Sequence, residues 1–185
     1  MPEANADGAD DTGADDAYGG LFGAIPYAFR ASRSRVFRLY AVVGVLAAVL
    51  VTVFMVLALV RLFGVTTSAV GGSLTLSRAF YVVVALFVVG PLLAPVLLVA
   101  RRHRRMGNGE RYDAWLGLAG FVFLASLYIG LVIAVPTSQQ EPSTGLFAPI
   151  VAVLYALPRQ TGLVPPILAA SFIWGVHRLR RTKPN

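Results

Sequence analysis

The side chains that could do chemistry in this sequence are few and widely separated. His103 and His177 are far apart, and no carboxylate motif accompanies either of them, so the clustered ligands of a metal site are missing. The chain has no cysteine, which excludes thiol nucleophiles, thiolate zinc sites and disulfides. Ser126 and Ser171 lie in apolar stretches, where a serine usually packs or bonds to its own helix. We therefore predict no catalytic residue, no metal site and no cofactor.

A polar break interrupts the apolar C-terminal part of the chain, in the stretch LYALPRQTGLVPP (154–166). It contains Arg159 and Gln160, and an arginine beside the end of a half-helix can form an anion site or a gate. Counting twenty residues back from His177, beside the basic C-terminus, reaches Pro158. This count places Arg159 near the outer membrane boundary, where its long side chain can also simply reach water or headgroups. Both interpretations of this pair stay open.

The composition predicts an all-α integral membrane protein. Hydrophobic residues make up 57% of the 185 residues, charged residues make up 14%, and the mean hydropathy is +0.71. A soluble globular chain has about 45–50% apolar and about 25% charged residues. Several apolar runs exceed the roughly 18 residues that are typical of a membrane-spanning helix.

Four membrane spans are predicted from the apolar runs, at residues 39–60, 79–100, 114–135 and 158–177. At 1.5 Å per residue, the first three are each about 33 Å long, enough for a bilayer core of about 30 Å. The apolar stretch LFAPIVAVLYAL (146–157) is too short to span and is predicted as a half-helix, either re-entrant or part of a long broken helix. The predicted fold is a four-span helical bundle with a broken or re-entrant segment before or within the fourth span.

The charges predict the orientation of these spans. Residues 1–20 carry six acids and no base, and are predicted to form a disordered acidic tail. Basic residues gather before the first span, between the second and third, and in the C-terminal tail 178–185. Because cytoplasmic loops carry an excess of Lys and Arg, we expect both termini in the cytoplasm and the spans in the plasma membrane. Since topology explains the bases, no nucleic-acid partner is expected.

Basic residues beside the spans are candidates for contacts with anionic lipid headgroups. The stretch 21–38 is predicted as a basic juxtamembrane helix, in which Phe22, Ile25, Phe29 and Val36 share one face. It fits either an interfacial helix or an ordinary positive flank. The predicted headgroup contacts are Arg30, Arg33, Arg101, Arg102, Arg104 and Arg105.

Small residues recur at four-residue spacing in three of the predicted spans, and such stripes let helices approach closely in lipid. They are Gly44, Ala48 and Thr52 in the first span, Ser126, Gly130 and Ala134 in the third, and Ser171 and Gly175 in the fourth. The stripes predict either packing within the bundle or association with a second copy or another membrane protein. In the second span, Gly90, Pro91 and Pro95 predict a kink.

Two kinds of residue mark the inner ends of the predicted spans. Asp113 precedes the third span and is predicted as its N-cap. Tyr40, Tyr112, Trp115 and Trp174 are predicted at the inner membrane–water interface, which Tyr and Trp favour.

The predicted spans contain no Asp, Glu or Lys. Proton-coupled pumps and exchangers use such groups as relays, so this class of transporter is disfavoured. We expect a structural or accessory membrane component without enzymatic activity, which binds lipid and a membrane-protein partner or a second copy. The alternative is a small channel or permease for an anionic or polar solute, gated by residues 146–166. A membrane enzyme is a third hypothesis, which no motif supports.

Overall fold

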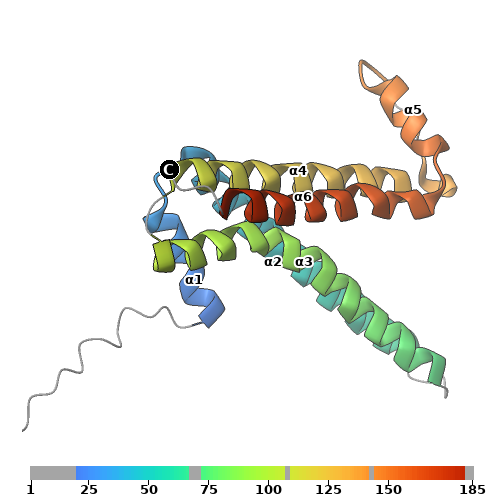
Figure 1. Cartoon of the computed structure of the whole chain (residues 1–185). Coiled ribbons are helices and arrows are strands. Elements are labelled where there is room, and N and C mark those ends of the chain that lie inside the picture. The colour runs from blue at the N-terminus through green and yellow to red at the C-terminus, as the bar shows by residue number, and fades with distance from the viewer. Residues whose placement is uncertain (1–19, 67–71, 107–108, 142–143, 182–185) are drawn as a thin grey trace, which may run out of the picture.

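The computed structural model describes residues 20–66, 72–106, 109–141 and 144–181, and the regular structure of these residues is entirely helical. The all-α prediction is therefore confirmed (Figure 1). Most of the acidic tail predicted for 1–20, and the last four residues of the basic tail, lie outside the described residues. The elements are α1 (Gly20–Ala31), α2 (Arg35–Thr66), α3 (Gly72–Met106), α4 (Glu110–Ala134), η1 (Thr137–Gln139), α5 (Ala148–Ala156), η2 (Arg159–Leu163) and α6 (Val164–Arg181).

Four helical stretches are long and apolar enough to cross a membrane. They are Arg35–Val65, Ala79–Arg105, Glu110–Ala134 and Arg159–Arg180. They overlap the four stretches predicted from the sequence, and the four-span fold class is confirmed. Helices α2 and α3 continue into the arginine-rich flanks of the predicted spans, because arginine is a good helix former and does not end a helix.

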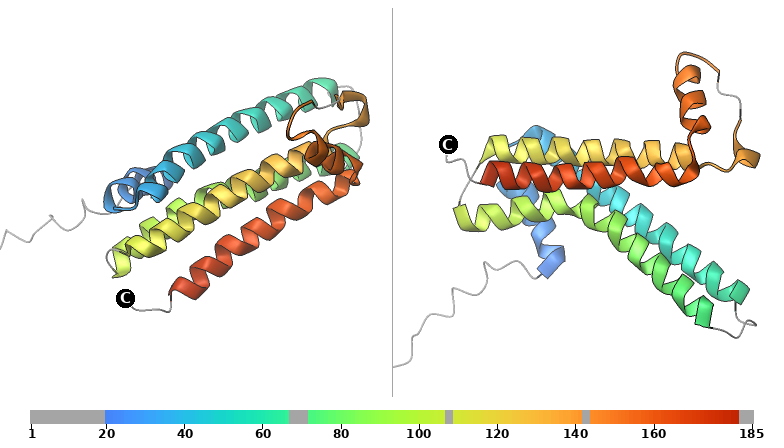
Figure 2. Two further views of the ribbon diagram at one scale, coloured as in Figure 1. Left: turned by 90° about the horizontal axis from the view of Figure 1, so that it is seen from above. Right: turned by 45° about the vertical axis from the view of Figure 1, so that its right-hand side comes forward.

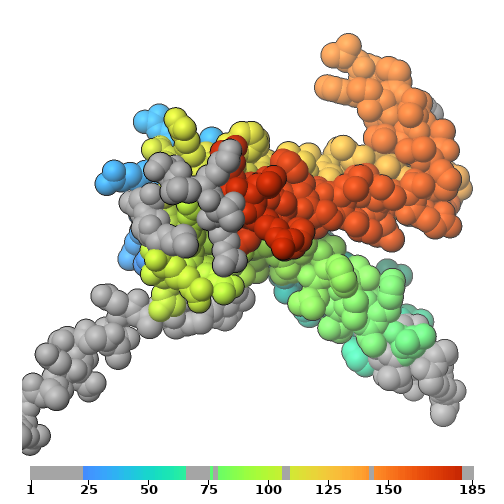
Figure 3. Space-filling model, viewed as in Figure 1, coloured from blue at the N-terminus to red at the C-terminus, as the bar shows by residue number. Residues whose placement is uncertain are grey.

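The long helices form two hairpins that meet at one end and diverge toward the other (Figures 1 and 2). Helix α2 pairs with α3, and α4 pairs with α6. We call the end where the hairpins meet the basic end, because the arginine-rich start of α2 and the arginine-rich ends of α3 and α6 lie there. The opposite end is called the open end. In the space-filling view, a wedge-shaped gap separates the two hairpins on that side (Figure 3).

Helix α3 bends in its middle, and this bend separates the hairpins (Figure 1). Pro91 and Pro95 lie in the middle of the helix, and each lacks the N–H that a regular helix uses. Each proline ring also crowds the preceding turn, so a kink results. The C-terminal half of α3 therefore approaches α6, while its N-terminal half runs with α2 (Figure 2). The kink that the sequence predicts is present.

The side chain of Tyr40 joins three helices in the core near the basic end. It is fully buried, and its hydroxyl donates a hydrogen bond of 2.7 Å to the carbonyl oxygen of Leu92 in α3. Leu92 lies between the two prolines, so this bond joins α2 to α3 beside the kink. The ring lies against Gly44 of α2 and Gly120 of α4, and Phe121 meets it edge to face. Tyr40 is therefore a core residue and not the interface anchor that the sequence predicts.

Helix α4 uses glycines to approach the backbone of its neighbours. A Cβ atom at Gly117 would lie only 2.9 Å from the Cα atom of Phe37 in α2. Near the open end, a Cβ atom at Gly162 in η2 would lie 2.7 Å from the carbonyl oxygen of Gly130. At both contacts the nearest atoms belong to the backbone. A larger residue could therefore not be accommodated by the movement of a flexible side chain.

The predicted small-residue stripes differ in what they contact. Buried members lie on α2 and α4, and they are Gly44, Ala48, Ser126 and Gly130. On α6, by contrast, Ser171 is exposed, and its hydroxyl donates to the carbonyl of Ile167 in its own helix. A Cβ atom at Gly175 would meet no atom within 4 Å. The stripe on α6 is therefore not used for packing inside the bundle.

The apolar stretch 146–157 forms the short helix α5, which projects to one side at the open end (Figures 1 and 2). None of its residues is buried. Leu157 has extended backbone angles, and Pro158 follows, so the chain breaks before η2 and α6 begin. The predicted break before the fourth span is therefore present, and a continuous helix from 146 to 177 is excluded.

The contact between Gly117 and Phe37 predicts a large effect of one methyl group. We expect Gly117→Ala to lower the free energy of unfolding by about 1–3 kcal/mol, because the new Cβ atom meets the backbone of α2. Gly175→Ala is the matched control, since its Cβ atom meets nothing within 4 Å and alanine is the better helix former. Reversible unfolding in mixed micelles measures the free energy of unfolding of the two variants. Equal stability of the two variants would show that the α2–α4 contact is looser than described.

Candidate functional site

Three polar side chains are buried together at the basic end. The Ser32 hydroxyl donates a hydrogen bond of 2.7 Å to Oδ2 of Asp113. Nε2 of His103 lies 2.9 Å from the same carboxylate oxygen. The side chain of Asp113 is fully buried, and that of His103 is 2% exposed. One carboxylate oxygen thus connects the segment between α1 and α2 with α3 and α4.

Asp113 reaches this position because α4 begins earlier than the sequence predicts. The helix starts at Glu110, with Gly109 as its N-cap, and the backbone N–H of Asp113 donates to the carbonyl of Gly109. The prediction that Asp113 is an N-cap is therefore wrong. It lies in the first turn of α4, where the helix dipole favours a carboxylate, and its side chain points into the bundle.

His103 is placed by the buried face of α3. Val96, Val99, Ala100 and His103 are all buried and follow one another at helical spacing, whereas the neighbouring Arg104 is exposed. The contact of His103 with Asp113 is one that the sequence analysis does not predict. This spacing is the sequence signal that could have found it, because the apolar face of α3 ends in a histidine instead of an arginine.

Ser32 lies in a turn that divides the predicted helix 21–38 into two parts. Residues 32–34 are not helical, and Ser34 acts as the N-cap of α2, since its hydroxyl accepts a hydrogen bond of 3.3 Å from the backbone N–H of Phe37. The guanidinium Nε of Arg38 donates to the carbonyl oxygen of Ser32 at 2.8 Å. The turn therefore holds the Ser32 hydroxyl toward Asp113, and the interruption follows from a serine cap.

The residue types are those of a hydrolase triad, but the order of their contacts is different. In such a triad the imidazole lies between the hydroxyl and the carboxylate and takes the proton of the serine. Here the carboxylate of Asp113 lies between Ser32 and His103, so the serine is bonded to no imidazole base. The other carboxylate oxygen, Oδ1, has no partner within the described part of the chain. The arrangement holds three segments together and differs from a hydrolase triad.

A layer of aromatic rings and arginines lies beside this cluster and joins α3, α4 and α6. The guanidinium of Arg102 lies 4.0 Å from the ring centre of Tyr112, and its Nη1 donates to the carbonyl of Arg180 at 3.3 Å. The hydroxyl of Tyr112 lies 2.6 Å from Nδ1 of His177. Arg180 covers the ring of Trp115 at 4.7 Å. Because Tyr112 is buried, it too is a core residue and not the predicted interface anchor.

The predicted headgroup contacts form an exposed basic rim around the buried cluster. Its exposed members are Arg30, Arg33, Arg101, Arg104 and Arg105. Arg102 differs, because it is partly buried between α3 and α6. Helix α1 packs Ala24 and Ala28 inward and leaves Phe29 exposed beside Arg30. This arrangement suits a helix that faces lipid on one side.

The predicted anion or gate pair, Arg159 and Gln160, lies at the open end and is not brought together with the other candidates. Both residues are exposed in η2, and Nη2 of Arg159 donates to the hydroxyl of Thr137 at 3.4 Å. Among the described residues, no group of three or more His, Asp and Glu side chains could hold a metal ion.

A family model described as "Domain of unknown function (DUF8056)" matches residues 9–181 of the chain. No curated protein and no solved structure matches it.

The shared carboxylate predicts a large and non-additive loss of stability. We expect Asp113→Ala to lower the free energy of unfolding by about 3 kcal/mol, because it leaves two buried donors without their acceptor. Ser32→Ala should lower the free energy of unfolding less in the Asp113→Ala background than in the parent chain, because Asp113→Ala has already removed the acceptor of the Ser32 hydroxyl. Chemical unfolding of the two single variants and the double variant measures this coupling. Glu110→Ala, an exposed carboxylate in the same turn, is the control and should change stability by less than about 0.5 kcal/mol. Strict additivity would contradict the shared contact.

Proposed function

We propose that this chain, which belongs to the DUF8056 family, is a non-enzymatic accessory component of the plasma membrane. It binds anionic lipid headgroups at its basic end and associates through helix α6 with a membrane-protein partner or a second copy. Four apolar helices indicate the membrane location.

The exposed small-residue face of α6 is the observation that carries this proposal. Four of the comparable residues of α2 and α4 are buried, namely Gly44, Ala48, Ser126 and Gly130, whereas Thr52 and Ala134 are exposed. On α6, one helical turn apart, Ser171 is exposed and a Cβ atom at the half-buried Gly175 would meet no atom within 4 Å. In lipid, small residues let a second helix come close enough for backbone contact. The small-residue face of α6 packs against no helix in the described part of its own chain, so it suits a helix of a second copy or of another membrane protein.

The buried polar cluster supports a role without catalysis. Ser32 and His103 both bond to Asp113 inside the bundle, and the Ser32 hydroxyl is not bonded to His103. Residues 146–166 offer less support for a gated permease, because α5 lies at the side of the open end and Arg159 is exposed and bonded to Thr137. The exposed arginines of the basic end suit the negative surface of a cytoplasmic leaflet.

The proposed orientation places the basic end in the cytoplasm, and the absence of cysteine allows a direct test. We expect Ser138→Cys, exposed in η1, to react with a membrane-impermeant maleimide in intact cells. Arg105→Cys, exposed at the basic end, should react only after the cells are permeabilised. The cysteine-free parent chain is the blank. The reverse labelling pattern would overturn the orientation.

The proposed association through α6 predicts a complex larger than the 19.7 kDa monomer after extraction in mild detergent. Gly175→Leu should dissociate it, because the added side chain fills the face where the monomer leaves open space. Gly64→Leu is the matched control, since its Cβ atom also meets nothing within 4 Å and it lies on α2. Light scattering and cross-linking in native membranes measure the mass. A partner-free monomer, or equal effects of both variants, would refute the association.

A further inference from the structure

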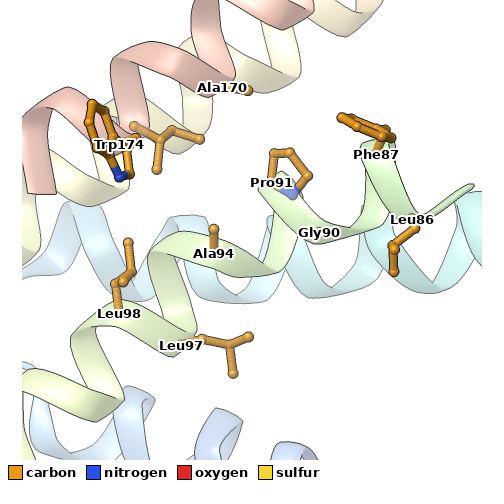
Figure 4. A pocket seen from close by; sticks show the side chains of 10 residues that line it. Leu86, Phe87, Gly90, Pro91, Ala94, Leu97, Leu98, Ala170 and Trp174 are labelled. Atoms are coloured by element: carbon orange, nitrogen blue, oxygen red, sulfur yellow. The ribbon is translucent and has the colours of Figure 1, made fainter. Parts of the chain in front are cut away.

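An apolar cavity of about 580 Å³ lies between α3 and α6. Figure 4 shows Pro91 and Ala94 of α3 and Ala170 and Trp174 of α6 at its border. The remaining lining side chains are also apolar, and they are Leu86, Phe87, Leu97, Leu98 and Ile173, with Gly90 beside them. Water is poorly suited to such a space, because an ordered water needs two or more polar partners.

The bend of α3 produces this cavity. Beyond the kink, the N-terminal half of α3 follows α2 and moves away from α6, and the small residues Gly90 and Ala94 do not fill the gap. Toward the basic end the gap is closed, because Arg102 of α3 donates to the backbone of Arg180 in α6. The cavity therefore lies on the open-end side of this contact, beside the kink.

Three exposed arginines follow the lining residues of α3 and α6 toward the basic end, within about two helical turns of the cavity. Arg101 follows Leu97 by four residues, and Arg105 follows Arg101 by four, so both continue the lining face of α3. On α6, the guanidinium of Arg178 lies 4.9 Å from the ring centre of Trp174. All three arginines are exposed. An apolar space below a group of arginines is complementary to a molecule with an anionic head and a hydrocarbon tail.

From this complementarity we infer that the α3–α6 cavity binds one acyl chain of an anionic phospholipid, whose phosphate is held by Arg101, Arg105 and Arg178. Guanidinium groups bind phosphate by paired hydrogen bonds. A partner helix does not suit the space, since a helix about 10 Å wide would fill this volume in about 7 Å of its length, little more than one turn. The inference deepens the lipid contact of the proposed function by assigning it to one site.

The two tryptophans of the chain provide the assay. In Trp115→Phe, the remaining Trp174 lies in the cavity wall and reports on acyl chains beside it. The full-length variant is reconstituted in phosphatidylcholine vesicles with a small fraction of phospholipid brominated on its acyl chains. We expect brominated phosphatidylglycerol to quench Trp174 more strongly than brominated phosphatidylcholine at the same fraction. Equal quenching by the two lipids would overturn the inference.

Two sets of variants separate the cavity from the arginines. Ala170→Phe fills the cavity and should abolish the preference for phosphatidylglycerol, whereas Ala125→Phe, at an exposed position of α4, should keep it. Arg101→Gln and Arg178→Gln, both at exposed positions, should each weaken the preference about fivefold. A preference that survives either Ala170→Phe or the two arginine changes together would refute the site.

The lipid site and the proposed association give separate readouts. Gly175→Leu is expected to change the mass of the complex and leave the quenching preference intact, because Gly175 does not line the cavity. Loss of the preference in Gly175→Leu would mean that the lipid binds between protein copies, and it would overturn the assignment to α3 and α6.

Discussion

The packing of the helices at the basic end depends on the carboxylate of Asp113. Its Oδ2 atom takes bonds from Ser32 and His103, and so joins the α1–α2 turn, α3 and α4 at one point. An ionisable group without water is costly to bury, and only such specific partners make its position stable. The neighbouring layer, in which Arg102 and Tyr112 reach α6, adds the fourth span to the same junction.

A second constraint is the kink of α3, which the core must accommodate. The prolines remove backbone donors in the middle of a span, where lipid supplies none. Beside the kink, the hydroxyl of Tyr40 donates to the carbonyl of Leu92, and the glycines of α2 and α4 make room for its ring. A tyrosine near the end of a predicted span is thus used inside the bundle. The kink can then redirect α3 without leaving that carbonyl dependent on its own helix alone.

The spans could be predicted from the sequence because a bilayer demands long apolar helices, and this demand acts on each segment by itself. The kink and the break before α6 could be predicted for the same reason, since proline acts locally. The polar cluster could not, because Ser32 and Asp113 are separated by 81 residues and meet only when the helices pack. The sequence predicts Asp113 as the N-cap because a carboxylate just before an apolar run is typical of that position. The helix in fact begins at Glu110, about one turn earlier, and the apolar pattern alone does not distinguish the two starting points. His103 has two arginines on each side in the sequence. It differs from them only because it continues the helical spacing of the buried residues of α3.

The shape of the molecule follows from where its polar contacts lie. Lipid tails are as apolar as the spans, so burying one apolar helix face against another brings little gain in a membrane. Helices then stay together where hydrogen bonds and close backbone contacts hold them. The α2–α3 hairpin is held to α4 and α6 at the basic end by the bonds of Asp113 and Arg102 and by the contact of the Tyr40 ring with Gly120. At the open end, the Gly130–Gly162 approach and the Arg159–Thr137 bond hold α4 to the segment leading into α6, and both lie within the second hairpin. The hairpins therefore diverge there, where no polar contact joins them within the described residues.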